Sequence, residues 1–101
     1  MNLAIIDYQA GNLGNVKKAI ESLGSNCEII SSPSSFKLFD GILLPGVGSF
    51  NKGMEALNHS GLSSTICNEV VNNNMPILGI CLGMHLLCSE GKEGGVVKGL
   101  D

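Results

Sequence analysis

The stretch PILGICLGMHLL, residues 76–87, joins two apolar segments through a cysteine that has a glycine two residues away on each side. The run at 76–80 is typical of a buried strand in a parallel sheet. The segment at 82–88 has the composition of a short helix. Cys81 therefore stands where a strand turns into a helix, and this arrangement predicts an α/β fold with Cys81 at the edge of the sheet.

A sharp turn from strand to helix projects one side chain above the sheet, and small neighbours allow such a turn to pack. The elbow of serine hydrolases has the pattern G-x-S-x-G, and here Gly79 and Gly83 flank the thiol of Cys81. A helix start also favours the thiolate, which is the form that attacks. We predict that Cys81 is a strained nucleophile and that the amide of Leu82 is one oxyanion donor. The alternative is a small buried cysteine among small residues.

A second loop, PGVG at 45–48, follows another apolar run and precedes an expected helix. Its two glycines allow backbone amides to approach a ligand closely. We predict that this loop supplies the second oxyanion donor, and that the amide of Val47 has two orientations, one away from Cys81 and one toward it. The alternative is an ordinary turn between a strand and a helix.

A cysteine nucleophile needs a base, usually a histidine oriented by a carboxylate. His59 lies in the polar segment LNHSG and is expected at the surface. His85 follows Cys81 by four residues, so its backbone lies about one helical turn away. We expect His85 to contact the substrate or the pocket wall rather than to act as the base. The sequence thus predicts a nucleophile and an oxyanion hole without a base.

The remaining apolar residues occur either in short continuous runs, typical of buried strands, or at spacings of three and four, typical of helices. The two kinds of segment alternate along the chain, which predicts a parallel sheet with flanking helices and right-handed crossovers. Gly24 and Gly61 are expected to end helices. The glycine-rich stretch at 89–101 looks like the start of a further element. We expect strands at 3–7, 27–30 and 76–80 and a third in the apolar run at 41–46, which Pro45 and Gly46 cut off. Helices are expected at 13–23, 50–60, 62–71 and 82–88.

The composition fits one small globular domain. The chain has 101 residues, of which 44% are hydrophobic, and a mean hydropathy of +0.27, so a packed core is expected. The formal charge is −3, and all six basic residues are lysines. This charge argues against a nucleic-acid partner, which would need a clustered basic face.

The sequence shows no sign of a membrane span, a signal peptide or a metal site. No apolar run approaches the length of a membrane span, and the N-terminus lacks a basic signal-peptide region. We therefore expect a cytoplasmic protein without membrane or metal partners. The cysteines have no zinc-like spacing, and we expect three of the four, Cys27, Cys67 and Cys88, to be small core residues.

Three blocks resemble class I (triad) glutamine amidotransferases, in particular the glutaminase subunits of imidazole glycerol phosphate synthase: IIDYQAGNL (5–13), ILLPGVGSF (42–50) and PILGICLGMHLL (76–87). The stretch SEGKEGGVVKGL (89–100) is similar to the segment that follows these blocks in that family. The resemblance covers the whole chain but about the first half of the family's usual length. It implies a flavodoxin-like amidotransferase fold that is incomplete at the C-terminus, with 1–101 as the N-terminal half of one domain.

The resemblance implies that Cys81 attacks the side-chain amide of glutamine, releases ammonia and forms a γ-glutamyl thioester that water hydrolyses. Ammonia would pass to a (β/α)₈-barrel cyclase, the heterodimer partner, which makes imidazole glycerol phosphate in histidine biosynthesis. No cofactor is implied. Further roles follow by position: Gly46, Val47, Gly48 and Leu82 in the oxyanion hole and glutamine pocket, His85 in glutamine binding, and Tyr8, Asn12 and Asn15 near the partner interface.

The chain departs from the family at several positions. His85 stands where a glutamine that binds the substrate is usual, Gln9 stands where glycine is common, and Gly14-Asn15 replaces a basic-polar pair. Nothing matches the family's catalytic His and Glu, so the 101-residue chain alone is expected to be inactive. Two alternatives remain open: an amidotransferase of another pathway, such as sugar amidation, and a truncated non-catalytic fragment that binds a partner.

Overall fold

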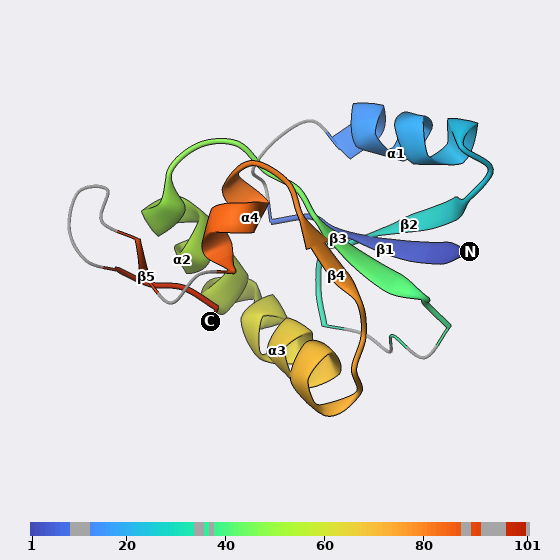
Figure 1. Cartoon of the computed structure of the whole chain (residues 1–101). Helices are drawn as coiled ribbons and strands as arrows, with labels where there is room; N and C mark the ends of the chain where they lie inside the picture. Colours follow the sequence, from blue (N-terminus) through green and yellow to red (C-terminus); the bar gives the residue numbers. More distant parts are fainter. Residues whose placement is uncertain (9–12, 34–35, 37, 88–89, 92–96, 101) are drawn as a thin grey trace.

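Four parallel strands form the centre of the fold, in the order β2-β1-β3-β4 (Figure 1). The computed structural model describes residues 1–8, 13–33, 36, 38–87, 90–91 and 97–100. The strands of this sheet are β1 (Asn2–Ile6), β2 (Asn26–Ile30), β3 (Gly41–Leu44) and β4 (Ile77–Gly79). The helices are α1 (Leu13–Ser22), α2 (Phe50–Ser60), α3 (Leu62–Asn72) and α4 (Leu82–Leu86).

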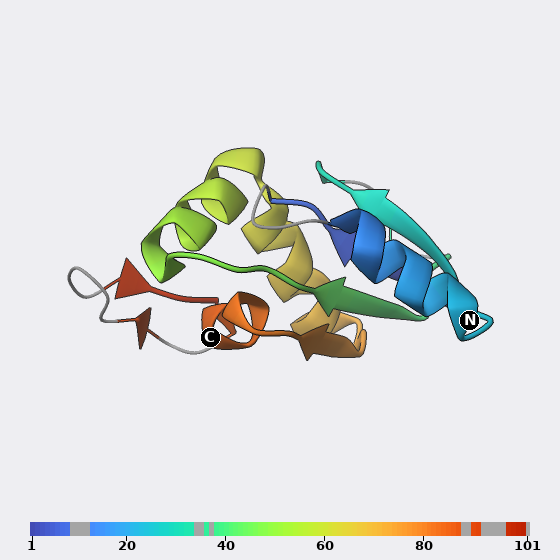
Figure 2. The same ribbon diagram turned by 90° about the horizontal axis from the view of Figure 1, so that it is seen from above.

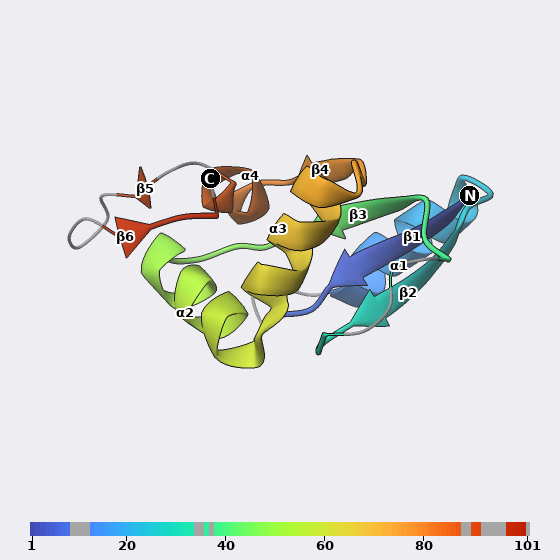
Figure 3. The same ribbon diagram turned by 90° about the horizontal axis from the view of Figure 1, so that it is seen from below.

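The helices lie on both sides of the sheet, as the alternating pattern predicted. Helix α1 lies on one face and α3 on the other, which the views from above and below both show (Figure 2, Figure 3). Helix α2 packs against α3 and α4, and α4 packs against β4. Because all four strands are parallel, their carboxyl ends meet at one edge, and the PGVG loop and the cysteine elbow both leave the sheet there.

The hydrophobic core lies between the two central strands and helices α2, α3 and α4. All four residues of β3 are buried, as expected for a strand covered on both faces. Helix α1 contributes no fully buried side chain. The buried cluster comprises Ala4, Ile6, Tyr8, Ile30, Phe36, Ile42, Leu44, Phe50, Met54, Leu57, Leu62, Ile66, Leu82 and Leu86.

One detail of the predicted elements is wrong. Leu23 was expected on the apolar face of the first helix, but 84% of it is exposed. The helix ends at Ser22, so its periodicity no longer governs the direction of Leu23. The third strand ends at Leu44, as expected from the interruption of its apolar run by Pro45 and Gly46: Pro45 has no N–H to donate, and Gly46 has a φ of +146°.

Cys27 and Cys67 are half-buried, so the prediction that they are core residues is wrong. Each lies at the border of the core and directs its Sγ at a backbone carbonyl, that of Lys17 at 3.8 Å and that of Leu100 at 3.7 Å. Cys88 lies outside the described residues.

Beyond α4, the structure contains a short antiparallel pair that the sequence did not predict: β5 (Glu90–Gly91) and β6 (Val97–Lys98). Strand β4 forms one edge of the described parallel sheet, and 61% of Leu78 is exposed there. Among the described residues, none of the helices has the length and apolar character needed to cross a membrane.

Candidate active site at the cysteine elbow

Cys81 occupies a strained position at the start of α4. Its backbone has φ 54° and ψ −118°, and only one other described non-glycine residue, Asn74, has a positive φ. A side chain held in such a region costs about 1–3 kcal/mol, and strain of this kind is concentrated at functional sites. The side chain of Cys81 is exposed to solvent. The predicted strained turn is therefore present, and the alternative of a buried cysteine is wrong.

The two glycines of the elbow are required by the close approach of backbone segments. A Cβ on Gly83 would lie 1.7 Å from the carbonyl oxygen of Leu44. A Cβ on Gly79 would lie 2.7 Å from the Cα of Met84. The start of α4 thus packs directly onto the end of β3 and onto β4, and no larger residue fits at either position without a backbone shift.

The backbone ladder between β3 and β4 continues past the ends of both strands. The N–H of Ile80 donates to the carbonyl of Leu44, and the N–H of Leu82 donates to the carbonyl of Gly46, each at 3.0 Å. Extending the register from the Leu44–Gly79 pair by two residues brings Gly46 beside Cys81. The structure therefore brings together the two motifs that the sequence singled out.

The amides expected to form the oxyanion hole do not face a common point in this conformation. The Leu82 N–H is already bonded to Gly46, and the N–H groups of Gly83 and Met84 donate to Ile80 and Cys81. The described chain has no cis peptide bonds, so the carbonyl and the N–H of the Gly46–Val47 peptide point in opposite directions. Since this carbonyl points at Leu82, the N–H of Val47 points away from it. The two orientations of the Val47 amide relative to Cys81 stay a prediction.

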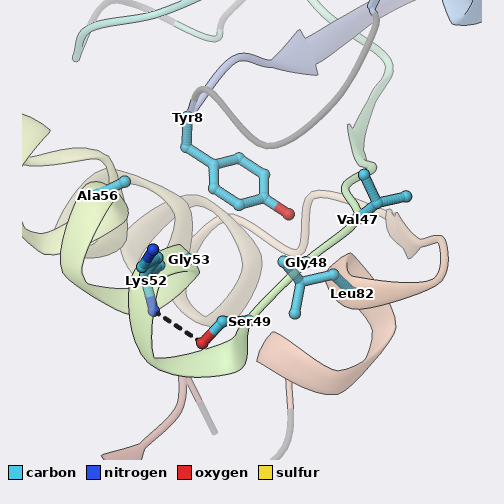
Figure 4. A pocket seen from close by; sticks show the side chains of 8 residues that line it. All are labelled: Tyr8, Val47, Gly48, Ser49, Lys52, Gly53, Ala56 and Leu82. Atoms are coloured by element: carbon cyan, nitrogen blue, oxygen red, sulfur yellow. Dashed lines mark hydrogen bonds between the residues drawn. The ribbon is translucent and has the colours of Figure 1, made fainter.

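A cavity of about 270 Å³ lies beside the PGVG loop (Figure 4). Cys81 is not among the described residues that line it. The lining residues come from the end of β1, the PGVG loop, α2 and the start of α4: Tyr8, Val47, Gly48, Ser49, Lys52, Gly53, Ala56 and Leu82. Val47 is 65% exposed.

Tyr8 is a predicted site residue that the structure places in the interior, as it does Leu82. Only 4% of Tyr8 is exposed, and its hydroxyl donates a hydrogen bond to the carbonyl of Pro45. Burial raises the pKa of Tyr8 to about 12, so its phenol remains protonated at neutral pH. No local pattern predicts this contact, because Tyr8 and Pro45 meet only through the pairing of β1 with β3.

Apart from Tyr8, the polar residues predicted to contact the substrate or the partner lie at the surface or outside the described part of the chain. His85 is exposed on α4, and Asn15 is exposed on α1. Asn12 lies outside the described residues. His59 is exposed near the end of α2, as predicted. Among the described residues, no carboxylate pairs with either histidine, and no cluster of three or more metal-binding side chains occurs.

The fold and the cysteine elbow define a class of protein. The family model described as "Glutamine amidotransferase class-I" matches residues 4–98. The chain therefore belongs to the class I glutamine amidotransferases. One solved structure, a "Crystal structure of glutamine amidotransferase", aligns with a TM-score of 0.73 and 17% identity over 86% of this chain and 46% of that one. At this identity the likeness supports the fold alone.

Within that family, the chain is similar to proteins named imidazole glycerol phosphate synthase subunit HisH. It is 46% identical to HisH 1 of Campylobacter jejuni (strain 81-176), over 97% of this chain and 49% of that protein. It is 47% identical to HisH of Geobacillus sp. (strain WCH70), over 97% and 46%, and 41% identical to HisH of Archaeoglobus fulgidus, over 98% and 47%. The chain spans about half the length of the curated relatives it matches.

Proposed function

We propose that this chain carries the nucleophile of a glutaminase that serves imidazole glycerol phosphate synthesis. The observation that carries the proposal is Cys81, exposed on a strained elbow beside a loop of rotatable peptides. Family membership and the similarity to HisH subunits support glutamine as the substrate and a cyclase subunit as the partner.

In this proposal, the sulfur of Cys81 attacks the side-chain carbonyl carbon of glutamine. The tetrahedral intermediate collapses, the C–N bond breaks, and the nitrogen leaves as ammonia after it gains a proton. Water then attacks the γ-glutamyl thioester, which releases glutamate and restores the thiol. The base that accepts the proton of Cys81 is expected outside the described residues, because no described histidine is oriented by a carboxylate.

Glutamine binding is assigned to the exposed surface around the elbow. The backbone of Gly46, Val47 and Gly48 would line one side of the substrate, and His85 would contact it from α4. An imidazole can donate or accept a hydrogen bond, so it can serve in place of an amide side chain. Asn15, exposed on α1, and Asn12 are assigned to the partner interface.

Activation requires the Gly46–Val47 peptide to rotate. In the observed orientation, its carbonyl accepts a hydrogen bond from the N–H of Leu82 at 3.0 Å. Turning this peptide over would free the Leu82 N–H and direct the Val47 N–H toward the elbow. One rotation would thus create both oxyanion donors, each worth roughly 10²–10³ in kcat. Partner binding that favours this rotation would prevent the release of unused ammonia.

The test compares two nitrogen sources in the complete protein assembled with its cyclase subunit. Cys81→Ala should abolish synthesis from glutamine and leave synthesis from ammonium salts, because the thiol serves only to release ammonia. Cys67→Ala is the matched control, since Cys67 is half-buried on α3 and distant in sequence from the elbow. Equal loss of glutamine-dependent synthesis in a folded Cys67→Ala variant would refute the choice of nucleophile.

A further inference from the structure

The position of Tyr8 is fixed by the sheet. The N–H of Asp7 donates to the carbonyl of Ile30 at 2.8 Å, which extends the β1–β2 ladder up to the residue before Tyr8. Strand β1 also pairs with β3, with Ile5 opposite Leu43. Continuing this register by three residues brings Tyr8 opposite Gly46, and its ring points toward the PGVG loop (Figure 4).

The hydroxyl of Tyr8 holds the last carbonyl before the rotating peptide. It donates to the carbonyl oxygen of Pro45, within the buried interior. The carbonyl of Leu44 is still bonded to the backbone of Ile80. The next carbonyl, that of Pro45, is bonded to the side chain of Tyr8 instead. With a pKa of about 12, the phenol remains a donor throughout the physiological pH range.

Two successive carbonyls of the loop therefore have different anchors. The carbonyl of Pro45 is held by a side chain, and that of Gly46 by the backbone of Leu82. Gly46 lies between them with a φ of +146°, a value that residues with a side chain rarely adopt. Rotation of the Gly46–Val47 peptide breaks the bond to Leu82 but leaves the bond between Tyr8 and Pro45 intact.

We propose that Tyr8 is a positioning residue for the PGVG loop (45–48). Its hydroxyl holds the Pro45–Gly46 peptide still, so that motion is confined to the Gly46–Val47 peptide and the Val47 amide arrives at one defined point. The inference rests on the proposed glutaminase function. It assigns to Tyr8 a role inside the subunit, in addition to any proximity to the partner.

Tyr8→Phe tests this role because it keeps the ring and removes the donor. In the complete protein with its cyclase subunit, we expect kcat for glutamine hydrolysis to fall about tenfold or more, with KM unchanged within about twofold. The fall is smaller than the roughly 10²–10³ expected when an oxyanion donor is removed, because the donor remains but is less well placed. 4-Aminophenylalanine at position 8 restores an N–H donor and should recover most of kcat.

Ser60→Ala is the matched control. Its hydroxyl also donates to a backbone carbonyl, that of Leu57 at 3.1 Å, but at the far end of α2. It should leave kcat and KM unchanged. A Tyr8→Phe protein with the kcat of wild type, or one that 4-aminophenylalanine fails to rescue, would overturn the positioning role. A wild-type complex without glutaminase activity would instead refute the proposed function.

A structure of the wild-type complex tests the same point without any variant. With a glutamine chloroketone bound covalently to Cys81, the hydrogen bond from Leu82 to Gly46 should be broken and that from Tyr8 to Pro45 retained. If the Pro45 carbonyl leaves Tyr8 when the loop rearranges, Tyr8 does not hold the segment and the proposal is wrong.

Discussion

Replacement of Gly83 by alanine should unfold the elbow, although helix propensity alone predicts the opposite. Alanine is favoured over glycine inside a helix by about 1 kcal/mol. At this position, however, the new Cβ would lie 1.7 Å from the carbonyl oxygen of Leu44, while real Cβ atoms essentially never come within 3.0 Å. Either α4 or the end of β3 must therefore move by more than about 1 Å.

The movement has two costs. Overpacking of this kind typically costs about 1–3 kcal/mol. It also separates the rungs formed by Ile80 with Leu44 and by Leu82 with Gly46, each worth about 1 kcal/mol. We expect Gly83→Ala to lower the free energy of unfolding by about 2–4 kcal/mol after the propensity gain is deducted, and to abolish glutaminase activity.

The measurement is denaturant-induced unfolding of the complete protein, followed by circular dichroism. Gly24→Ala provides the comparison, because Gly24 has a φ of +89° but nothing within 4 Å of the added Cβ. It should lose only the conformational cost, about 1–2 kcal/mol. If Gly83→Ala proves no less stable than Gly24→Ala, the argument from backbone contact at the elbow is refuted.

Three further changes test the site and the core. His85→Ala should raise KM for glutamine by roughly 2- to 13-fold, which corresponds to the loss of a hydrogen bond of about 0.5–1.5 kcal/mol. His85→Gln should be tolerated. A fall in kcat of about 10³ at constant KM would instead indicate that His85 transfers a proton. Gly48→Pro should reduce kcat, because proline cannot adopt the φ of +115° and lacks the amide; the loss should reach about 10²–10³ if the Gly48 amide is itself an oxyanion donor. Full activity with full partner stimulation would rule out the rotating loop. Leu57→Ala, at a fully buried site, should cost about 2–5 kcal/mol in denaturant unfolding, and Leu38→Ala, 84% exposed, almost nothing; equal losses would contradict the assigned core.

The elements nearest the chemistry were predictable because their residues are defined by local constraints. A cysteine between two glycines after an apolar run specifies a strand, a strained turn and a helix start within one short segment, and Cys81 has that geometry. The boundary at Leu23 was not predictable in the same way, since helix periodicity does not reveal where the last turn stops. The β5–β6 pair was missed because two residues per strand carry no detectable alternation.

The conformation of the PGVG loop could not be predicted from the sequence alone. Whether the Leu82 amide is free depends on a rung that β3 and β4 form beyond their assigned ends. The contact between Tyr8 and Pro45 depends in turn on the register of β1 against β3. Both are pairings between segments far apart in the chain, and strand register is a property of the assembled sheet.

The hydrogen bond between Leu82 and Gly46 also limits how fully the site can be held in its inactive orientation. A single hydrogen bond contributes about 0.5–1.5 kcal/mol net, which corresponds to a population ratio of only about 2 to 13. If this bond were the whole free-energy difference between the two orientations, the proposed glutaminase without its partner would have both donors exposed for about 7% to a third of the time. If the cyclase stimulates glutamine hydrolysis much more than tenfold, breaking this one hydrogen bond cannot account for the effect. The rest must then come from changes in the glycine backbone angles or in the catalytic base.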